Sequence, residues 1–132
     1  MIPFEFTIKG PPISLQAKPA SRNRWKTAVA AAATAVAQGA VPTTDEVAIS
    51  ITYYYDGDTP DVDNIIKPIQ DALIGIGYVD DAQVMQAKSS KTKINGSFTI
   101  RGASPILLMA FSDRDAFVHI RVTEPPDLSN LQ

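Results

Sequence analysis

The sequence contains no cysteine and a single histidine, His119. Without thiols the chain can form no disulfide, zinc–thiolate site or cysteine nucleophile. It also lacks an uninterrupted apolar stretch of the ~18 residues that a membrane span needs, and residues 1–10 show neither the basic start nor the apolar run of a secretion signal. These absences predict a cytoplasmic protein that does not associate with membranes.

An excess of basic residues is missing as well, since the net charge is −2 and the sequence pI is about 5.2. The charges are unevenly distributed along the chain. Residues 1–44 carry five basic residues against one acid, residues 45–87 carry nine acids against Lys67 alone, and residues 88–132 carry six basic residues against four acids. A metal site that meets phosphate would give this pattern, and so would an acidic surface segment.

The length of 132 residues is that of one domain with one core. Alternating apolar and polar residues predict strands over 4–9, 47–55, 84–87 and 116–123. In the second of these, Val47, Ile49, Ile51 and Tyr53 share one face. Apolar residues at helical spacing and helix-start signals predict helices over 22–38, 63–74 and 105–111, with Ser21, Asp63 and Ser104 as their N-caps.

Strands and helices therefore alternate, which predicts an α/β (mixed α+β) single domain: a mixed sheet of about four strands with two to three helices packed on it. The interior Pro68 is an objection to the second helix, because proline removes a backbone hydrogen bond. We place the domain at residues 1–124 and expect residues 125–132 to be a flexible tail. The polar, basic stretch 88–101 is expected to be an exposed excursion.

Three aspartates and a lysine form the most informative pattern. Asp61 and Asp63 stand two residues apart before the second helix, where an extended chain places both carboxylates on one side. Lys67 follows Asp63 by one helical turn. The helix is roughly 18 Å long at 1.5 Å per residue, and the seven residues 75–81 can span about 23 Å, so Asp81 can return to the start of the helix.

Grouped carboxylates need a cation to offset their repulsion. Oxygen ligands of this kind suit Mg²⁺ or Mn²⁺. Such an ion polarises a phosphoryl oxygen and activates a water for in-line attack, and Lys67 would stabilise the charge that builds on the phosphate. The alternative is a capped, acid-rich turn before a helix. A calcium loop of the EF-hand type is excluded, because the sixth position counted from Asp56 is Asp61 instead of glycine.

The string DVDNIIKPIQDAL (residues 61–73), followed by GIGYVDDAQV (residues 75–84), resembles the signature of the RusA family of Holliday-junction resolvases. The family pattern is roughly Asp-x-Asp-Asn-x-x-Lys-x-x-x-Asp-Ala-Leu, a short glycine-containing link, then Asp-Asp-x-Gln-Val. The opening strand, which ends in Gly-Pro-Pro-x-Ser at residues 10–14, is also similar. The likeness is weaker elsewhere, and residues 88–115 look longer than in compact members.

The resemblance implies metal ligands at Asp61, Asp63 and Asp81, a catalytic lysine at Lys67, and supporting roles for Asn64 and Asp80. It further implies Mg²⁺ or Mn²⁺ as cofactor, a four-way DNA junction as substrate, a phage or prophage origin and a homodimer. A homodimer suits paired symmetric nicks, because two nicks need two active sites. The low pI is the departure from this picture, since a protein that holds branched DNA is expected to be more basic.

Further basic residues could contact DNA, although solvated side chains are an alternative in each case. Trp25 could stack on a base or be partly buried, His119 is interpreted as a surface residue, and Asp71 is expected to form a structural hydrogen bond or ion pair. The residues with predicted DNA contacts are Arg22, Arg24, Trp25, Lys26, Lys88, Lys91 and Lys93.

The sequence thus predicts a Mg²⁺-dependent, structure-selective endonuclease. Two alternatives remain open at this point. The chain could be a branched-DNA-binding module that does not cut, or a structural domain that the metal only stabilises.

Overall fold

The computed structural model describes residues 3–13, 16–55, 65–94, 104–112 and 116–126. Strands and helices alternate along the chain, which confirms the predicted order and the α/β fold class. A short 3-10 turn, η2 (Asp81–Gln83), precedes the third strand. The other elements are β1 (Phe4–Lys9), α1 (Pro19–Ala37), β2 (Val47–Tyr55), α2 (Ile66–Ala72), β3 (Val84–Lys93), α3 (Pro105–Ser112) and β4 (Phe117–Thr123).

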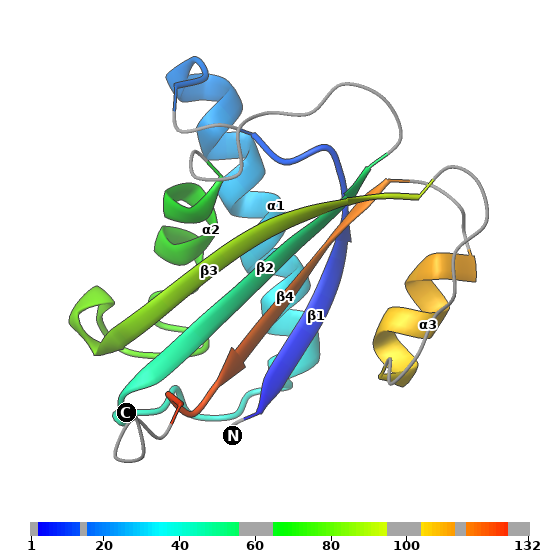
Figure 1. Cartoon of the computed structure of the whole chain (residues 1–132). Helices are drawn as coiled ribbons and strands as arrows, with labels where there is room; N and C mark the ends of the chain where they lie inside the picture. Colours follow the sequence, from blue (N-terminus) through cyan, green and yellow to red (C-terminus); the bar gives the residue numbers. More distant parts are fainter. Residues whose placement is uncertain (1–2, 14–15, 56–64, 95–103, 113–115, 127–132) are drawn as a thin grey trace, which may run out of the picture.

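The four strands form one mixed sheet in the order β1-β4-β2-β3 (Figure 1). β4 runs antiparallel to both β1 and β2, whereas β3 lies parallel to β2 at the edge of the sheet. The parallel β2–β3 pair is connected through α2, as parallel strands require a crossover. The carboxyl ends of β2 and β3 therefore lie at the same end of the sheet, with Tyr55 opposite Lys93.

One face of the sheet carries the hydrophobic core, and α1 and α2 cover it (Figure 1). The alternation predicted for the second strand is confirmed, because Val47, Ile49, Ile51 and Tyr53 are all buried. From the helices, Trp25 and Val29 of α1 and Ile69 of α2 pack into this core. Burial of such apolar side chains supplies most of the driving force for folding.

The opposite face of the sheet is mostly polar, apart from the stacked rings of Tyr54 and Phe117. α3 lies beside β1 on this side (Figure 1). Glu5 Oε2 lies 2.7 Å from His119 Nε2 and accepts a hydrogen bond of 3.0 Å from Ser104 Oγ. Ser104 also caps α3 by accepting the Leu107 N–H at 3.2 Å. The interpretation of His119 as a surface residue is therefore wrong, since its side chain is only 13% exposed and pairs with Glu5.

Two other predictions need correction. α1 begins at Pro19, with Lys18 as its N-cap, instead of being capped by Ser21; a proline at the first helical position loses no hydrogen bond, because that N–H has no partner inside the helix. β3 continues to Lys93, well past the predicted end at Ala87. Residues 88–93 of the basic stretch are largely exposed, as expected, but they form an edge strand instead of an irregular excursion. Residues 95–101 of the stretch lie outside the described residues.

α2 is shorter than the predicted helix over 63–74, since it runs from Ile66 to Ala72. Pro68 thus falls in the first helical turn, where its missing N–H costs nothing. The N-cap predicted at Asp63 lies outside the described residues. Gly75 follows the helix with a φ of 86°, a backbone conformation that glycine adopts without a steric penalty.

The predicted tail has only residues 125–126 within the described ranges. Within those ranges, no helix is both long enough and apolar enough to cross a membrane.

Candidate active site

Asp81 and Lys67 meet beside α2, although fourteen residues separate them in the sequence. Lys67 Nζ donates a hydrogen bond of 3.2 Å to Asp81 Oδ2. The chain between α2 and η2 therefore folds back on the helix, as the length argument allowed. The side chains of Lys67 and Asp81 are 47% and 39% exposed, so both remain accessible to a ligand.

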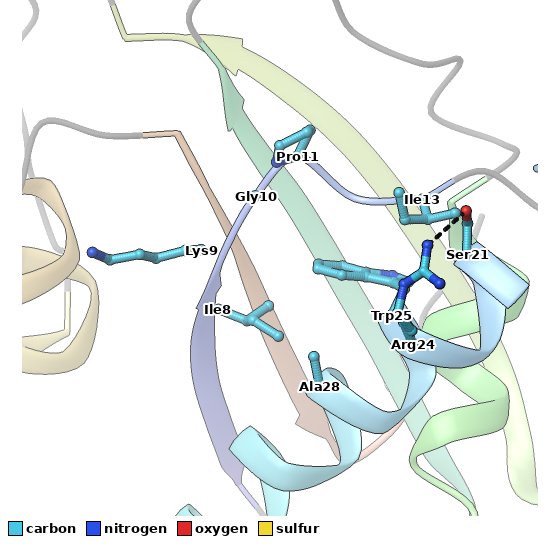
Figure 2. Close-up of a pocket in the computed structure, with 9 residues that line it drawn as sticks. All are labelled: Ile8, Lys9, Gly10, Pro11, Ile13, Ser21, Arg24, Trp25 and Ala28. Atoms are coloured by element: carbon cyan, nitrogen blue, oxygen red, sulfur yellow. Dashed lines mark hydrogen bonds between the residues drawn. The ribbon is translucent and has the colours of Figure 1, made fainter.

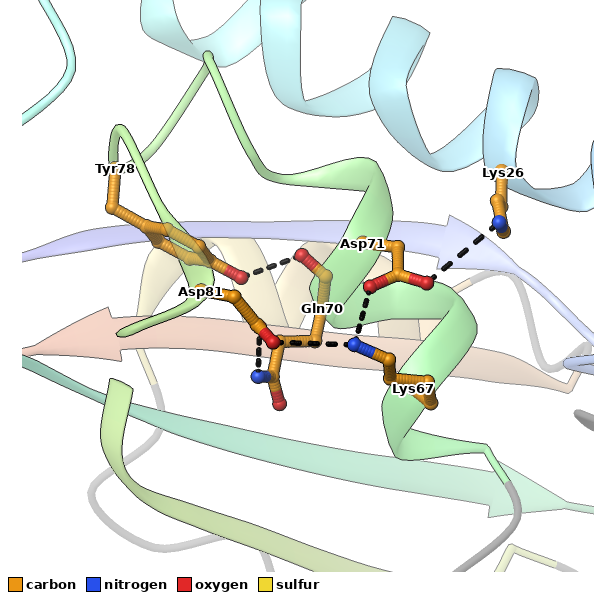
Figure 3. A network of polar contacts seen from close by, with 6 residues as sticks. All are labelled: Lys26, Lys67, Gln70, Asp71, Tyr78 and Asp81. Atoms are coloured by element: carbon orange, nitrogen blue, oxygen red, sulfur yellow. Dashed lines mark hydrogen bonds and ion pairs between the residues drawn. The ribbon is translucent and has the colours of Figure 1, made fainter. Parts of the chain in front are cut away.

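A linear polar network extends from this pair (Figure 3). Lys67 Nζ also lies 2.9 Å from Asp71 Oδ1, one helical turn further along α2. Asp71 Oδ2 in turn lies 3.7 Å from Nζ of Lys26 on α1. The ion pair expected for Asp71 is confirmed. Positive and negative groups alternate along the network, which keeps Lys67 between two carboxylates.

Gln70 completes the environment of Asp81, because its side-chain Nε2 donates a hydrogen bond to Asp81 Oδ1. This hydrogen bond, helped by the Lys67 ammonium and opposed by partial burial, lowers the pKa of Asp81. The hydrogen bonds to Asp71 and then to Asp81 raise the pKa of Lys67. At neutral pH the site therefore presents an ionised carboxylate beside a protonated lysine.

Tyr78 links the turn that carries Asp81 to the end of α2. Its ring is fully buried, and its hydroxyl donates a hydrogen bond of 2.6 Å to the backbone carbonyl of Gln70. That carbonyl lies in the last turn of α2, where backbone carbonyls no longer have the N–H partner that a continuing helix would supply. Burial, and then the charges of Asp81 and Asp71, raise the pKa of Tyr78, so the hydroxyl keeps its proton.

Gln83 fixes the turn that carries Asp81. Its Oε1 accepts the backbone N–H groups of Val79 and Asp80, each at 2.8 Å. Its Nε2 donates to the carbonyls of Thr43 and Asp45, each at 2.8 Å. One side chain thus ties this turn to the loop before β2. Asp80 is exposed and forms a capping box with Gln83 at the start of η2, in which each side chain faces the backbone N–H of the other residue.

Asp61, Asp63 and Asn64 lie outside the described residues. Within the described part of the chain, no three histidine or acidic side chains gather closely enough to hold a metal ion. Among the described residues of the site, Asp71 and Asp81 carry carboxylates. Asp81 is the more exposed of the two, and its carboxylate has about four lone-pair positions. Because Gln70 and Lys67 each engage one oxygen, lone pairs remain on both oxygens for a cation.

The predicted lysine patch on β3 divides between the two faces of the sheet. Lys91 pairs with Tyr53, and Lys93 with Tyr55, so both share the face that α1 and α2 cover. Lys88 pairs with Ser50 and lies on the opposite face. Only Lys91 and Lys93 are therefore on the same side of the sheet as Lys67.

The basic start of α1 borders a pocket of about 400 Å³ between this helix and the end of β1 (Figure 2). Arg24 is exposed and donates a hydrogen bond of 3.3 Å to Ser21. Trp25 is only 7% exposed and belongs to the core. Of the two interpretations of Trp25, the buried one is therefore correct. The ring is not exposed for stacking on a DNA base. Arg22 and Arg24 remain at the surface of the helix start.

Gln70, Tyr78 and Gln83 are site residues that the sequence interpretation did not single out. Gln70 follows Lys67 by three residues, a spacing that places two side chains on one helical face. Gln83 occupies the glutamine position of the Asp-Asp-x-Gln-Val pattern. No comparable signal identifies Tyr78, because its contact with Gln70 depends on how the turn after α2 packs.

Comparison with known proteins adds one finding. The sequence model of the family described as Endodeoxyribonuclease RusA matches residues 14–100, which is most of the chain and includes α1, β2, α2 and β3. No curated protein matches the sequence closely.

Proposed function

Since the chain belongs to the RusA endodeoxyribonuclease family, we propose that it resolves Holliday junctions by Mg²⁺- or Mn²⁺-dependent hydrolysis of phosphodiester bonds. The single observation that carries this proposal is the contact of Lys67 with Asp81. It brings the lysine and the final aspartate of the family pattern together at one accessible site, beside the point where residues 61–64 lead into α2.

Asp81, Asp61 and Asp63 would hold the metal ion. Ile65 directly precedes α2, and in the sequence Asp63 stands only two residues before Ile65. Lys67 lies one residue beyond Ile66, the first residue of α2, and already touches Asp81. A bound Mg²⁺ would supply Lewis-acid polarisation of the scissile phosphate and a lowered pKa for the attacking water.

Lys67 would stabilise the negative charge that grows on the phosphate during attack. Its raised pKa keeps it protonated across the neutral range, and its 47% exposure leaves the ammonium within reach of DNA. Asp71 Oδ1 lies 2.9 Å from Lys67 Nζ and forms a second contact with it that does not involve Asp81. Lys67 can therefore release Asp81 and still stay in place.

The DNA backbone would approach over the face of the molecule that carries Lys67. Lys91 and Lys93 lie on this side of the sheet, at the end where β2 leads into residues 56–64. Arg22, Arg24 and Lys26 at the start of α1 provide further cations. Contacts of this kind position DNA without reading its sequence.

We further propose that the active form is a homodimer that makes paired nicks. A four-way junction has two-fold symmetry, and two equivalent cuts require two equivalent sites. A single chain has one copy of the Asp61, Asp63, Lys67 and Asp81 set, so a second copy must supply the other.

The decisive experiment is cleavage of a synthetic four-way junction beside a linear duplex of the same sequence, with Mg²⁺, with Mn²⁺ and with a chelator. We expect paired nicks on the junction that require the metal. Asp63→Asn and Asp81→Asn should abolish cleavage but keep DNA binding, and Asp45→Asn, at an exposed aspartate before β2, serves as the matched control. Metal-independent junction binding by the wild type without any cleavage would refute the proposal.

A further inference from the structure

Gln70 connects α2 to the turn that carries Asp81. Its side chain reaches from α2 to the Asp81 carboxylate, and its own backbone carbonyl receives the Tyr78 hydroxyl (Figure 3). Tyr78 stands three residues before Asp81. Gln70 therefore contacts the turn that carries Asp81 at two separate places.

These two contacts restrict Asp81 in different ways. The hydrogen bond from Tyr78, at 2.6 Å, fixes the distance between the last turn of α2 and the chain that leads to Asp81. The hydrogen bond from Gln70 Nε2 then fixes the rotation of the carboxylate, because it holds Oδ1 and leaves Oδ2 toward Lys67. Without the amide, Lys67 is the one remaining described side-chain partner of Asp81, and Lys67 is shared with Asp71.

We propose that Gln70 is a positioning residue that holds the Asp81 carboxylate in the orientation needed to bind the catalytic metal ion, with Tyr78 anchoring Gln70 from the core. This proposal rests on the proposed function, in which Asp81 is a metal ligand. A carboxylate that is already oriented loses less freedom when a cation binds, so its affinity for the cation is higher.

The test compares Gln70→Met with wild type, because methionine keeps the length of the side chain and removes the amide group with both of its polar atoms. Gln86→Met is the matched control, since Gln86 lies exposed on β3 away from the site. Mn²⁺ binding to the full chain is measured by the loss of the free-ion electron paramagnetic resonance signal, and junction cleavage is measured across Mn²⁺ concentrations. Melting temperatures show whether each variant folds, and Gln70→Ala replaces Gln70→Met if the latter does not.

Gln70→Met should weaken Mn²⁺ binding about tenfold, the usual effect of removing a group that orients a metal ligand. Cleavage should recover toward the wild-type rate once Mn²⁺ is saturating. Tyr78→Phe, which keeps the buried ring, should weaken Mn²⁺ binding less, and Gln86→Met should leave it unchanged.

Wild-type affinity for Mn²⁺ in Gln70→Met would overturn the proposal, as would a loss of cleavage that saturating Mn²⁺ does not restore. In both cases the proposed function stands if the wild type binds Mn²⁺ and cuts the junction. A wild type that binds no Mn²⁺ would overturn both proposals together.

Discussion

Replacing Gln83 by methionine should destabilise the protein more than its partly exposed position suggests. The side chain forms four hydrogen bonds of 2.8 Å, two to backbone N–H groups and two to backbone carbonyls. Each hydrogen bond contributes about 0.5–1.5 kcal/mol net. Four such hydrogen bonds would together contribute about 2–6 kcal/mol. Because water can replace some of them in the variant, the free energy of unfolding should fall by roughly 2–3 kcal/mol, toward the lower end of that range.

Thermal unfolding followed by circular dichroism measures this loss directly. For a domain of this size each kcal/mol corresponds to roughly 3–5 °C, so the melting temperature should fall by about 10 °C. Gln86→Met, the same exchange on the exposed edge strand, should change it by less than about 2 °C. A Gln83→Met variant that melts together with Gln86→Met would refute the view that Gln83 ties the Asp81 turn to the loop before β2.

Two further predictions concern charged groups. Lys67→Met should lower junction cleavage by about 10²–10³-fold while changing the melting temperature little, because the side chain is 47% exposed; wild-type cleavage rates in this variant would contradict the role given to Lys67. Burial acts to raise the pKa of Glu5, but the hydrogen bonds from His119 and Ser104 outweigh it and the net pKa is lowered. The stabilisation by Glu5 should therefore be complete above its ordinary pKa of 4.5 and be lost as the pH falls below that value. In urea unfolding, Glu5→Gln should be less stable than wild type by roughly 1–2 kcal/mol at pH 7, and the difference should shrink at pH 3; an equal difference at both pH values would argue against the linkage.

The sequence was sufficient to predict the elements whose side chains alternate between core and solvent. Val47–Tyr55 was predicted with both ends correct, because one face of β2 is buried and the other is more polar. β1 and β4 follow the same rule. Their periodicity is a direct consequence of burial on one side of a sheet.

β3 beyond Ala87 escaped prediction for the converse reason. It is an edge strand with few buried side chains, so its sequence carries no alternation between apolar and polar residues. What makes it a strand is backbone pairing with β2, which continues to Lys93. Lysines along an edge also protect it from pairing with other chains, and the same residues made the stretch look like an irregular loop.

His119 shows a second limit of local patterns. Alternation with Val118 and Ile120 correctly placed it on the face away from the core. That face is not open to solvent at this position, because Glu5 and the start of α3 lie against it. The contact joins residues 114 positions apart in the chain, which no window of sequence can reveal.

The part of the site that the sequence predicted consists of charged residues that occupy positions of the family pattern. Lys67 and Asp81 were identified, and the structure brings them into contact. The neutral residues that orient them were missed, since an amide or a buried hydroxyl matters only through its partner. Gln70 and Tyr78 acquire their roles once the turn after α2 has folded back on the helix.

The fold also bears on how an acidic chain can hold DNA. Asp45, Glu46 and Asp80 lie where β2 and β3 begin, since Gln83 links the backbones of Asp45 and Asp80 there. Lys91 and Lys93 lie where these strands end. The eight steps from Val47 to Tyr55 span about 26 Å at 3.3 Å per residue, well beyond the screening length of ~8 Å at physiological salt.

The acids at one end of the sheet therefore do not neutralise the lysines at the other, and the net charge of −2 is a poor guide to the local field. Asp71 and Asp81, on the face of Lys67, are already paired with lysines. In the sequence, the four aspartates of residues 56–64 follow directly on β2, whose last residue lies opposite Lys93. In the proposed function two of these bind a doubly charged cation, so the charge that opposes DNA at this end is offset by the ion that the reaction requires.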